Sequence, residues 1–435
     1  MKKVLTVLLI LILTSTIVFA EGQSDKASGE VALKWWHHMP LDGAQGKLFA
    51  EYAKEFEAAN PGITVSIESI PHAEYIKKIP TAIASGQAPD IYGLSYRNLY
   101  TYADNGAMSP LDDAALKALG LSSFSDLESQ WAPGALDSYK IGNTYYGLPF
   151  QFNIYAYIIN TKHFREAGLD PETDYPKTWD DVYEVAAKLV QKDGDRITRQ
   201  ALSFPFEHSA AWYMLELEPI MRELGGSILS DDQTVCLINS KEGVAAMEEI
   251  KKRFDLGVSD SNIAANLDYY NEGFPTGKFS MTVGGQWGPP RWYKNFADVT
   301  EEGDFKAIPY PSYPGKDPAI STTSWAWVVS STSTEKDWAW KLADFVTLMP
   351  SRNIIETGDT IPRAGWSETE GAKTIPQADF WEEMIQYSQP LANFEKYSEV
   401  SEPLKRAMQE ILLSGADIQK TLDSVKKEID LALSE

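Results

Sequence analysis

The segment MTVGGQWGPPRW, at residues 281–292, contains two tryptophans, Trp287 and Trp292, which bracket Gly288-Pro289-Pro290. The segment starts as a short apolar strand, and the glycine and proline pairs that follow are typical of a tight loop. Indoles on such a loop have two possible uses, because Trp287 and Trp292 can fill a hydrophobic core or offer a flat apolar surface to a ligand. The segment alone leaves both uses open.

Motifs for catalysis are mostly missing from the chain. It has no G-x-S-x-G nucleophile elbow, no HExxH zinc motif and no C-x-x-C pair. The stretch GFPTGKF (273–279) is one residue shorter than a phosphate-binding loop and has Phe279 where a magnesium-binding Ser or Thr belongs. A glycan hydrolase needs two carboxylates facing each other across a cleft, and the sequence neither indicates nor excludes such a pair.

Metal and thiol chemistry are also disfavoured. His37 and His38 are adjacent on an expected strand, so their side chains point to opposite faces and cannot chelate one ion together. Cys236 is the only cysteine, which rules out an intrachain disulfide. It lies in the strand-like run TVCLINS and is expected to be a small buried residue. We therefore expect neither a metal nor a cofactor.

The first twenty residues predict export from the cytoplasm. Two lysines precede an apolar run, and Val18-Phe19-Ala20 fits a signal-peptide cleavage pattern. The run is too short to span a bilayer, and no cysteine follows the cleavage site to carry a lipid anchor. We expect a signal peptide at 1–20, a flexible leader at 21–30 and a periplasmic location.

Charge and length limit the possible partners and the architecture. The formal net charge of −23, from 62 acidic and 39 basic residues, becomes −25 once Lys2 and Lys3 leave with the signal peptide. A chain this acidic, without a basic cluster, repels nucleic acid and anionic membranes, so neither is an expected partner. The remaining length, about 415 residues, is too great for one core and suits two lobes.

Strands and helices alternate along the chain. Residues 31–39 read as a strand, 46–62 as a helix, 63–70 as a strand, 73–86 as a helix and 89–95 as a strand. This order is typical of a parallel sheet with crossover helices. A similar pattern returns later, with a helix at 176–190 capped by Thr178, so we expect an α/β protein with two sheets. Residues 402–433 read as one continuous helix.

Five segments in register resemble the extracellular solute-binding proteins of ATP-binding-cassette sugar importers, in particular the family 1, maltodextrin-binding-protein-like group. They are SGQAPDIYGL (85–94), GNTYYGLPFQFNIYAYIINTKHFREAGLDP (142–171), PKTWDDVYEVAAKL (176–189), FPTGKFSMTVGGQWG (274–288) and DTIPRAGW (359–366). Each segment alone is a weak signal. Together they cover nearly the whole chain after the signal peptide in the family's order.

The resemblance implies a type II periplasmic-binding-protein fold, in which two α/β lobes joined by three hinge crossings close on a ligand. Crossings near 148–151, 323–327 and 357–361 would give a first lobe of 31–148 plus 326–358 and a second of 149–325 plus 359–435. The resemblance also implies a monomer without enzymatic activity that captures a mono- or oligosaccharide and delivers it to importer permease subunits. Another polar solute, such as glycerol phosphate or a polyamine, and a secreted glycan hydrolase remain alternatives.

A sugar offers apolar faces and a ring of hydroxyls, so its site needs aromatic surfaces and fixed polar groups. The chain's 13 Trp and 21 Tyr could supply the aromatic surfaces. Ligands of open α/β sheets bind beyond the carboxyl ends of the strands. The resemblance then implies these ligand-binding residues, most of them just after expected strands: His37, His38, Asp42, Ser95, Tyr96, Gln151, Asn153, Glu207, His208, Trp212, Trp287, Trp325 and Arg363.

Trp287 matches a tryptophan that stacks on a sugar ring in the family, and the glycines before it would leave room for a ligand near the backbone. Trp292, beyond the prolines, is expected to pack inside the protein. Gln151 and Asn153 interrupt an apolar run, and polar side chains there need a partner.

The other candidates rest on their match to loops that hold the ligand in the family. His37, His38 and Asp42 follow the first strand, and ordinary surface-loop positions remain the alternative for them. Arg97, next to Tyr96, could hydrogen-bond to a ligand as well.

Overall fold

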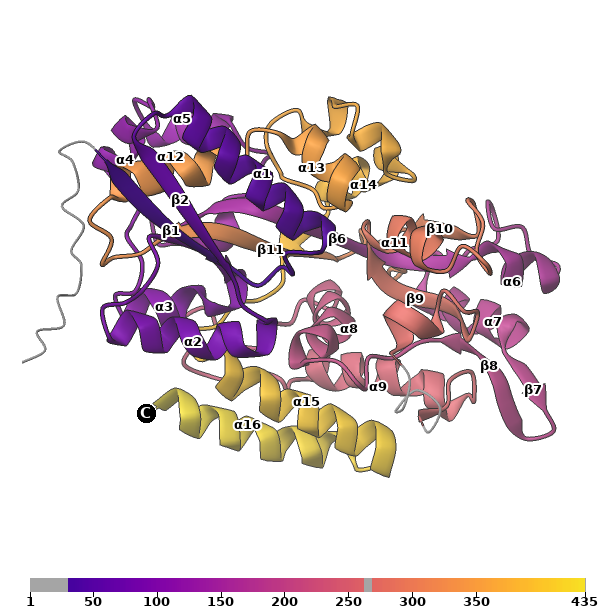
Figure 1. Cartoon of the computed structure of the whole chain (residues 1–435). Helices are drawn as coiled ribbons and strands as arrows, with labels where there is room; N and C mark the ends of the chain where they lie inside the picture. Colours follow the sequence, from indigo (N-terminus) through magenta and orange to yellow (C-terminus); the bar gives the residue numbers. More distant parts are fainter. Residues whose placement is uncertain (1–29, 262–267, 435) are drawn as a thin grey trace, which may run out of the picture.

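The structure is a computed structural model that describes residues 30–261 and 268–434. It is a mixed α/β protein with two lobes, joined by strands that run through the middle of the molecule (Figure 1). The expected signal peptide and nearly all of the expected leader lie outside the described residues. Within the described part, no helix combines the length and apolar character needed to cross a membrane.

The first lobe begins with an alternating series of strands and helices. The series is β1 (Val31–His37), α1 (Ala44–Ala59), β2 (Ile63–Ser69), α2 (His72–Ala84) and β3 (Ile91–Ser95). β1 pairs in parallel with both β2 and β3, so the predicted parallel sheet is confirmed. Since parallel strands end at the same edge of a sheet, the loops after β1 and β3 leave the sheet on the same side.

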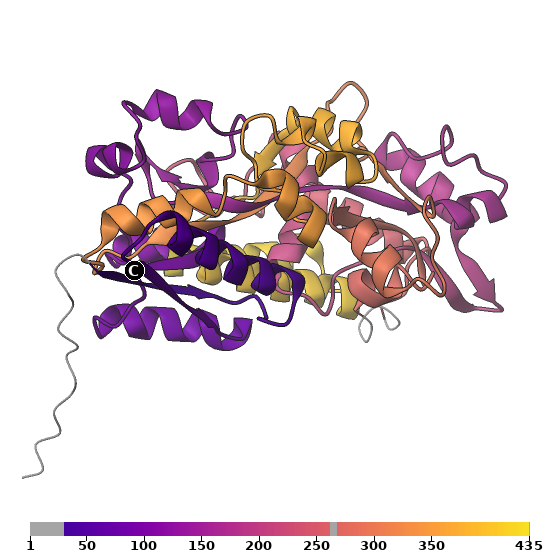
Figure 2. The ribbon, with the colours of Figure 1, turned by 45° about the horizontal axis from the view of Figure 1, so that its top comes forward.

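Two long strands join the lobes: β6 (Leu148–Asn160) and β11 (Ile320–Val329). β6 pairs with β11 over its first half, from Leu148 to Ile154, and with β9 (Phe279–Gly285) over its second half, from Tyr155 to Ile159. The resulting order is β2-β1-β3-β11-β6-β9-β8-β7. The two expected sheets are therefore one continuous, curled sheet (Figure 2).

The second lobe extends this sheet with β7 (Gln191–Asp193), β8 (Arg196–Leu202), β9 and β10 (Phe305–Ile308). Helix α7 (Trp179–Leu189) starts at the expected N-cap. The Thr178 hydroxyl accepts a hydrogen bond from the Asp181 backbone N–H, and the Asp181 carboxylate accepts one from the Thr178 backbone N–H. This capping box holds two N–H groups that a helix start would leave unpaired.

The remaining elements are short or cover the sheet. The helices are α3 (Leu99–Asp104), α4 (Asp113–Ala118), α5 (Phe124–Ser129), α6 (Thr161–Glu166), α8 (Ala210–Glu223), α9 (Lys241–Asp255), α11 (Gly288–Asn295), α12 (Lys336–Phe345), α13 (Pro350–Thr357) and α14 (Ala378–Ile385). The short strands are β4 (Lys140–Ile141), β5 (Thr144–Tyr145) and β12 (Ser388–Pro390). Single turns of 3-10 or π helix lie at Tyr96–Asn98, Asp137–Tyr139, Tyr269–Gly273, Trp366–Glu368 and Ala372–Thr374.

The expectation of one continuous C-terminal helix is wrong. The structure has two helices, α15 (Tyr397–Ser414) and α16 (Ile418–Ser434), which fold back on each other beside α8 and α9 (Figure 1). Gly415 ends α15 with a φ of 68°, a left-handed conformation that glycine adopts without strain. The apolar spacing continues through this break because both helices bury the same kind of face.

Cys236 lies in a loop and not in the expected strand, although its burial was predicted correctly. It is fully buried, and only an isolated bridge to Leu229 gives the segment strand character. Two residues of α16 hold the Cys236 backbone. The Asp430 carboxylate accepts a hydrogen bond from the Cys236 N–H at 2.7 Å, and the Lys426 amine donates one to the Cys236 carbonyl at 2.8 Å. Burial raises the pKa of the thiol to about 11, so it stays protonated at neutral pH.

The segment after α13 lies against the first lobe. The Ala132 backbone N–H donates to Pro362, the Ala364 N–H donates to Gln130, and Trp131 forms a bridge with Arg363. Contact with the second lobe follows at Gln377, whose side chain exchanges two hydrogen bonds with the Ala307 backbone in β10. The expected lobe boundaries stay a prediction.

Candidate functional site

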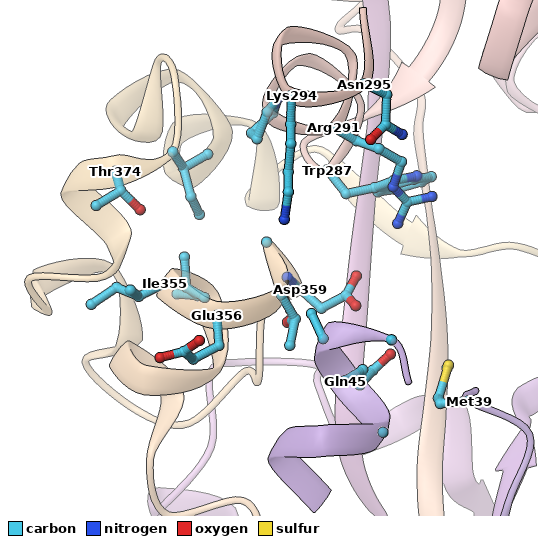
Figure 3. A pocket seen from close by; sticks show the side chains of 18 of the residues that line it. Met39, Gln45, Trp287, Arg291, Lys294, Asn295, Ile355, Glu356, Asp359 and Thr374 are labelled. Carbon is cyan, nitrogen blue, oxygen red and sulfur yellow. Dashed lines mark hydrogen bonds between the residues drawn. The ribbon is translucent and has the colours of Figure 1, made fainter. Parts of the chain in front are cut away.

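A cleft of about 500 Å³ opens between the two lobes. One wall is α11 of the second lobe, with Trp287 at its start. The other consists of the loop after β1 with the start of α1 (39–46), the end of α13 with the residues after it (354–359), and Thr374 and Ile375 (Figure 3). The loop after β1 reaches the cleft because the carboxyl end of that strand faces it.

The loop that carries Trp287 is fixed by the residue before it. Gln286 is buried, and its side chain accepts a hydrogen bond from the Ile154 N–H at 2.9 Å and donates one to the Phe152 carbonyl at 2.8 Å. Gln286 thus continues the pairing of β6 where β9 ends, as a backbone strand would. Sequence reasoning missed this role, which the run GGQWG next to an expected strand end could have suggested.

Trp287 is 8% exposed and lines the cleft. Its ring lies 5.2 Å from the Tyr155 ring at 87°, an edge-to-face contact. A Cβ added at Gly285 would overlap the Trp287 ring, and one at Gly284 would overlap the ring of Tyr270. The glycines therefore make room for these two protein side chains, and the interpretation that they leave space for a ligand is wrong.

Further aromatic side chains surround Trp287. Trp212, in the first turn of α8, has its ring 5.9 Å from Tyr155 and 5.4 Å from Tyr270. His208 lies 5.1 Å from the Trp212 ring, and its Nε2 is 3.3 Å from an Asp268 carboxylate oxygen. Trp287 and Trp212 therefore both pack edge-to-face on Tyr155, and His208 packs on Trp212. Trp292 is buried in α11, as expected.

The first lobe supplies a second aromatic pair. The rings of His38 and Trp325 lie 4.2 Å apart, and His38 is also 5.7 Å from the Tyr75 ring. Both members of this pair are partly exposed. His38 follows β1 and Trp325 lies in β11, so pairing within one sheet brings them together.

Polar groups on the hinge strands connect the two aromatic groups. Asn153 donates to the Thr323 hydroxyl at 3.3 Å, and the Tyr155 hydroxyl lies 3.3 Å from the same oxygen. Asn153 and Thr323 face each other across the β6–β11 pair. The Asn153 amide nitrogen therefore has a neighbouring strand residue as its partner, while the buried Asn153 Oδ1 has no hydrogen-bond partner among the described residues.

Gln151 has a different partner, Asp359, at 2.8 Å from its amide nitrogen. Asp359 is 5% exposed and lines the cleft, with its carboxylate drawn there in Figure 3. Burial raises the pKa of the Asp359 carboxyl, while the charge of Arg291 and the Gln151 hydrogen bond oppose that shift. Arg363 was the residue of segment 359–366 expected to bind the ligand, whereas the structure brings Asp359 to the cleft. The sequence signal for Asp359 was Gln151, a polar residue in an apolar strand that needs a partner.

The two walls of the cleft carry opposite charges. Arg291 and Lys294 project from α11, while Glu356 and Asp359 lie on the facing wall (Figure 3). The charged side chains that line the cleft therefore balance, with two cations and two carboxylates.

Of the expected site residues, only Trp287 lines the 500 Å³ cleft, and two of the others are buried within the protein. His37 is 1% exposed, with its ring 5.1 Å from Phe49, and its Nδ1 accepts a hydrogen bond from the Met39 N–H. Arg363 forms an ion pair with Asp344, donates to Gln130 at 3.0 Å and covers the Trp131 ring at 4.1 Å. These contacts occupy the Arg363 guanidinium within the first lobe.

The last four expected residues are Ser95 and Tyr96, which are buried, and Asp42 and Glu207, which are exposed outside the cleft. Ser95 accepts a hydrogen bond from Arg97 at 3.3 Å, and the Tyr96 carbonyl accepts one from Asn393.

Comparisons with known proteins agree on one family. The family model described as bacterial extracellular solute-binding protein matches residues 42–351. The maltotriose-binding protein of Pyrococcus abyssi is 25% identical to this chain, over 75% of this chain and 64% of that protein. The sn-glycerol-3-phosphate-binding periplasmic protein of Shigella dysenteriae is 31% identical, over 59% of this chain and 57% of that protein. A solute-binding protein from Thermotoga lettingae, solved with alpha-D-tagatose, has a TM-score of 0.77 and 21% identity over 93% of this chain and 100% of its own. At that identity the structural likeness concerns the fold.

Protonation of His37 should destabilise the protein in acid. Burial lowers the pKa of His37 to about 4, below the ordinary value of 6.5 that the unfolded chain retains. The folded state therefore binds this proton less well, and stability present at pH 7 falls as the pH drops from 6.5 towards 4, by up to about 3 kcal/mol. Urea unfolding at pH 7 and pH 4.5 should show a smaller loss for His37→Gln than for the wild type. An equal loss in both would contradict the assignment.

The packing of Trp287 over Gly285 predicts a coupled pair of substitutions. Gly285→Ala should lower the free energy of unfolding by about 1–3 kcal/mol, because the new methyl group overlaps the indole. In a Trp287→Ala background the same substitution should cost much less, since the ring is gone. Urea unfolding of the wild type, both single variants and the double variant measures this coupling. Additive effects would show that the ring does not occupy this space.

Proposed function

Since the chain belongs to the bacterial extracellular solute-binding protein family, we propose that it captures a carbohydrate between its two lobes and delivers it to the permease of an ATP-binding-cassette importer. The protein would act in the periplasm as a monomer, after removal of a signal peptide at 1–20. The proposal includes a first lobe of 31–148 plus 326–358 and a second of 149–325 plus 359–435, with residues 362–364 of the last segment packed against the first lobe. Binding would occur without turnover of the ligand.

The observation that carries this proposal is the placement of aromatic and polar groups on and around the strands that join the lobes. His38 and Trp325 stand on one side, and Tyr155, Trp212 and Trp287 on the other. Polar groups from β6, β11 and the segment after α13 lie among them. Flat rings suit the C–H faces of a sugar, and fixed amides and carboxylates suit its hydroxyls.

The balance of charge favours an uncharged ligand. A phosphate ester would require an excess of cations in the cleft, and a polyamine an excess of carboxylates. Arg291 and Lys294 face Glu356 and Asp359, which gives neither excess. Glycerol phosphate, named for one relative, is therefore the second candidate, and a sugar, named for another, is the first.

A thermal-shift screen against a panel of saccharides tests the proposal directly. A ligand that binds only the folded state stabilises it by mass action, so at least one sugar should raise the melting temperature in a concentration-dependent way. Glycerol 3-phosphate and spermidine belong in the panel as the competing solutes. Stabilisation by glycerol 3-phosphate alone would overturn the assignment to sugars.

Trp287→Ala should weaken binding of the stabilising sugar by about 1–3 kcal/mol, the loss expected when a well-placed aromatic contact disappears. Isothermal titration calorimetry measures the change. Trp338→Ala, on the partly exposed surface of α12, is the control and should bind as the wild type does. Unchanged affinity in Trp287→Ala would place the ligand elsewhere.

A further inference from the structure

The oppositely charged walls of the cleft belong to different lobes. α11 follows β9, which pairs with the second half of β6. α13 packs against α1 of the first lobe, and the segment after it is held there through Gly371, whose N–H donates to Ser351 at 2.8 Å. A change in the angle between the lobes therefore changes the distance between α11 and α13.

Lys294 and Glu356 face each other across this cleft (Figure 3). Both side chains are exposed, and within the described residues neither forms an ion pair at 4.0 Å or less. Arg352, also on α13, differs, because it pairs with both Glu51 and Glu55 of α1 and so serves the packing of the first lobe. The fold of either lobe does not use Lys294 or Glu356 in this way.

The mouth of the same cleft has uncovered apolar side chains. Ile355, on the α13 wall that faces α11, is 57% exposed and lines the cleft. Leu41, next to the lining residue Pro40 in the loop after β1, is 52% exposed. Approach of α11 would remove part of this apolar surface from water, which favours the approach.

We propose that Lys294 and Glu356 form an ion pair across the cleft when the lobes close, and that they act as positioning residues for ligand capture. The inference rests on the proposed function, because it assigns the pair to the closed, ligand-bound form. Arg291 and Asp359 are the inner counterpart of this pair, since Arg291 already acts electrostatically on the Asp359 carboxylate. The outer pair adds attraction between the lobes without touching the ligand.

The size of the effect depends on water and salt. An exposed ion pair contributes little, but a pair that closure shields from water attracts more strongly. Salt screens the attraction before the pair forms, with a Debye length of about 10 Å at 0.1 M and about 3 Å at 1 M. The affinity for an uncharged sugar should therefore fall as ionic strength rises, although the sugar itself carries no charge.

Charge reversal of the exposed pair tests the inference. Lys294→Glu and Glu356→Lys should each weaken binding of maltotriose by about threefold to tenfold, and the double variant should recover to near the wild-type value. Calorimetry at low and high salt should show the salt dependence in the wild type and in the double variant. Lys47→Glu, on the exposed face of α1, is the matched control for Lys294→Glu, with the same change in net charge.

Each outcome of the titrations has a distinct meaning. If the single variants bind weakly and the double variant does not recover, the two side chains contact the ligand and the inference is wrong. Unchanged affinity in the single variants also overturns it, while the proposed function stands as long as the wild type binds. If the wild type binds neither maltotriose nor any other sugar of the panel, the proposed function fails.

Discussion

Strand β6 is the constraint on which the rest of the structure depends. Each of its edges is paired in both lobes: by β11 and then β10 on one edge, and by the Thr360 carbonyl, the Gln286 side chain and then β9 on the other. A strand in the middle of a sheet must satisfy its N–H and C=O groups along its whole length. The thirteen residues of β6 therefore join the two lobes in one sheet. Halfway along, β6 changes its partner from β11 to β9, and this change divides the sheet between the two lobes.

The candidate site and the joint between the lobes share the same residues. Gln151, Asn153 and Tyr155 follow one another on one face of β6, since alternate residues of a strand point the same way. Their partners, Thr323 and Asp359, come from the other two segments that pass between the lobes. A ligand held by these side chains, as proposed, would touch three segments that pass between the lobes, which would couple binding to the angle between the lobes.

The sequence predicted most of the regular structure, and its errors have physical causes. The parallel strands β1 to β3 and the Thr178 cap were predicted correctly, because both depend on local spacing. The break at Gly415 was missed, because the apolar spacing continues across it. At the site, Trp287 was placed on the cleft, but the role of the glycines before it was wrong, because only the folded chain shows that protein side chains fill the space above them.

By itself, the sequence determined the family, through five segments that resemble it in register, and the α/β class, through the alternation of strand and helix patterns. Only the tertiary structure decided which polar side chains meet. Arg363 is occupied by Asp344 within the first lobe, whereas Asp359, four residues earlier, meets Gln151 at the cleft. Arg291 and Lys294 reach the cleft because α11 begins directly after Trp287, and both side chains project from it towards the other lobe. These contacts join residues that are up to 208 positions apart in the sequence. Their distances depend on the order of strands in the sheet and on the angle between the lobes, and neither follows from local sequence spacing.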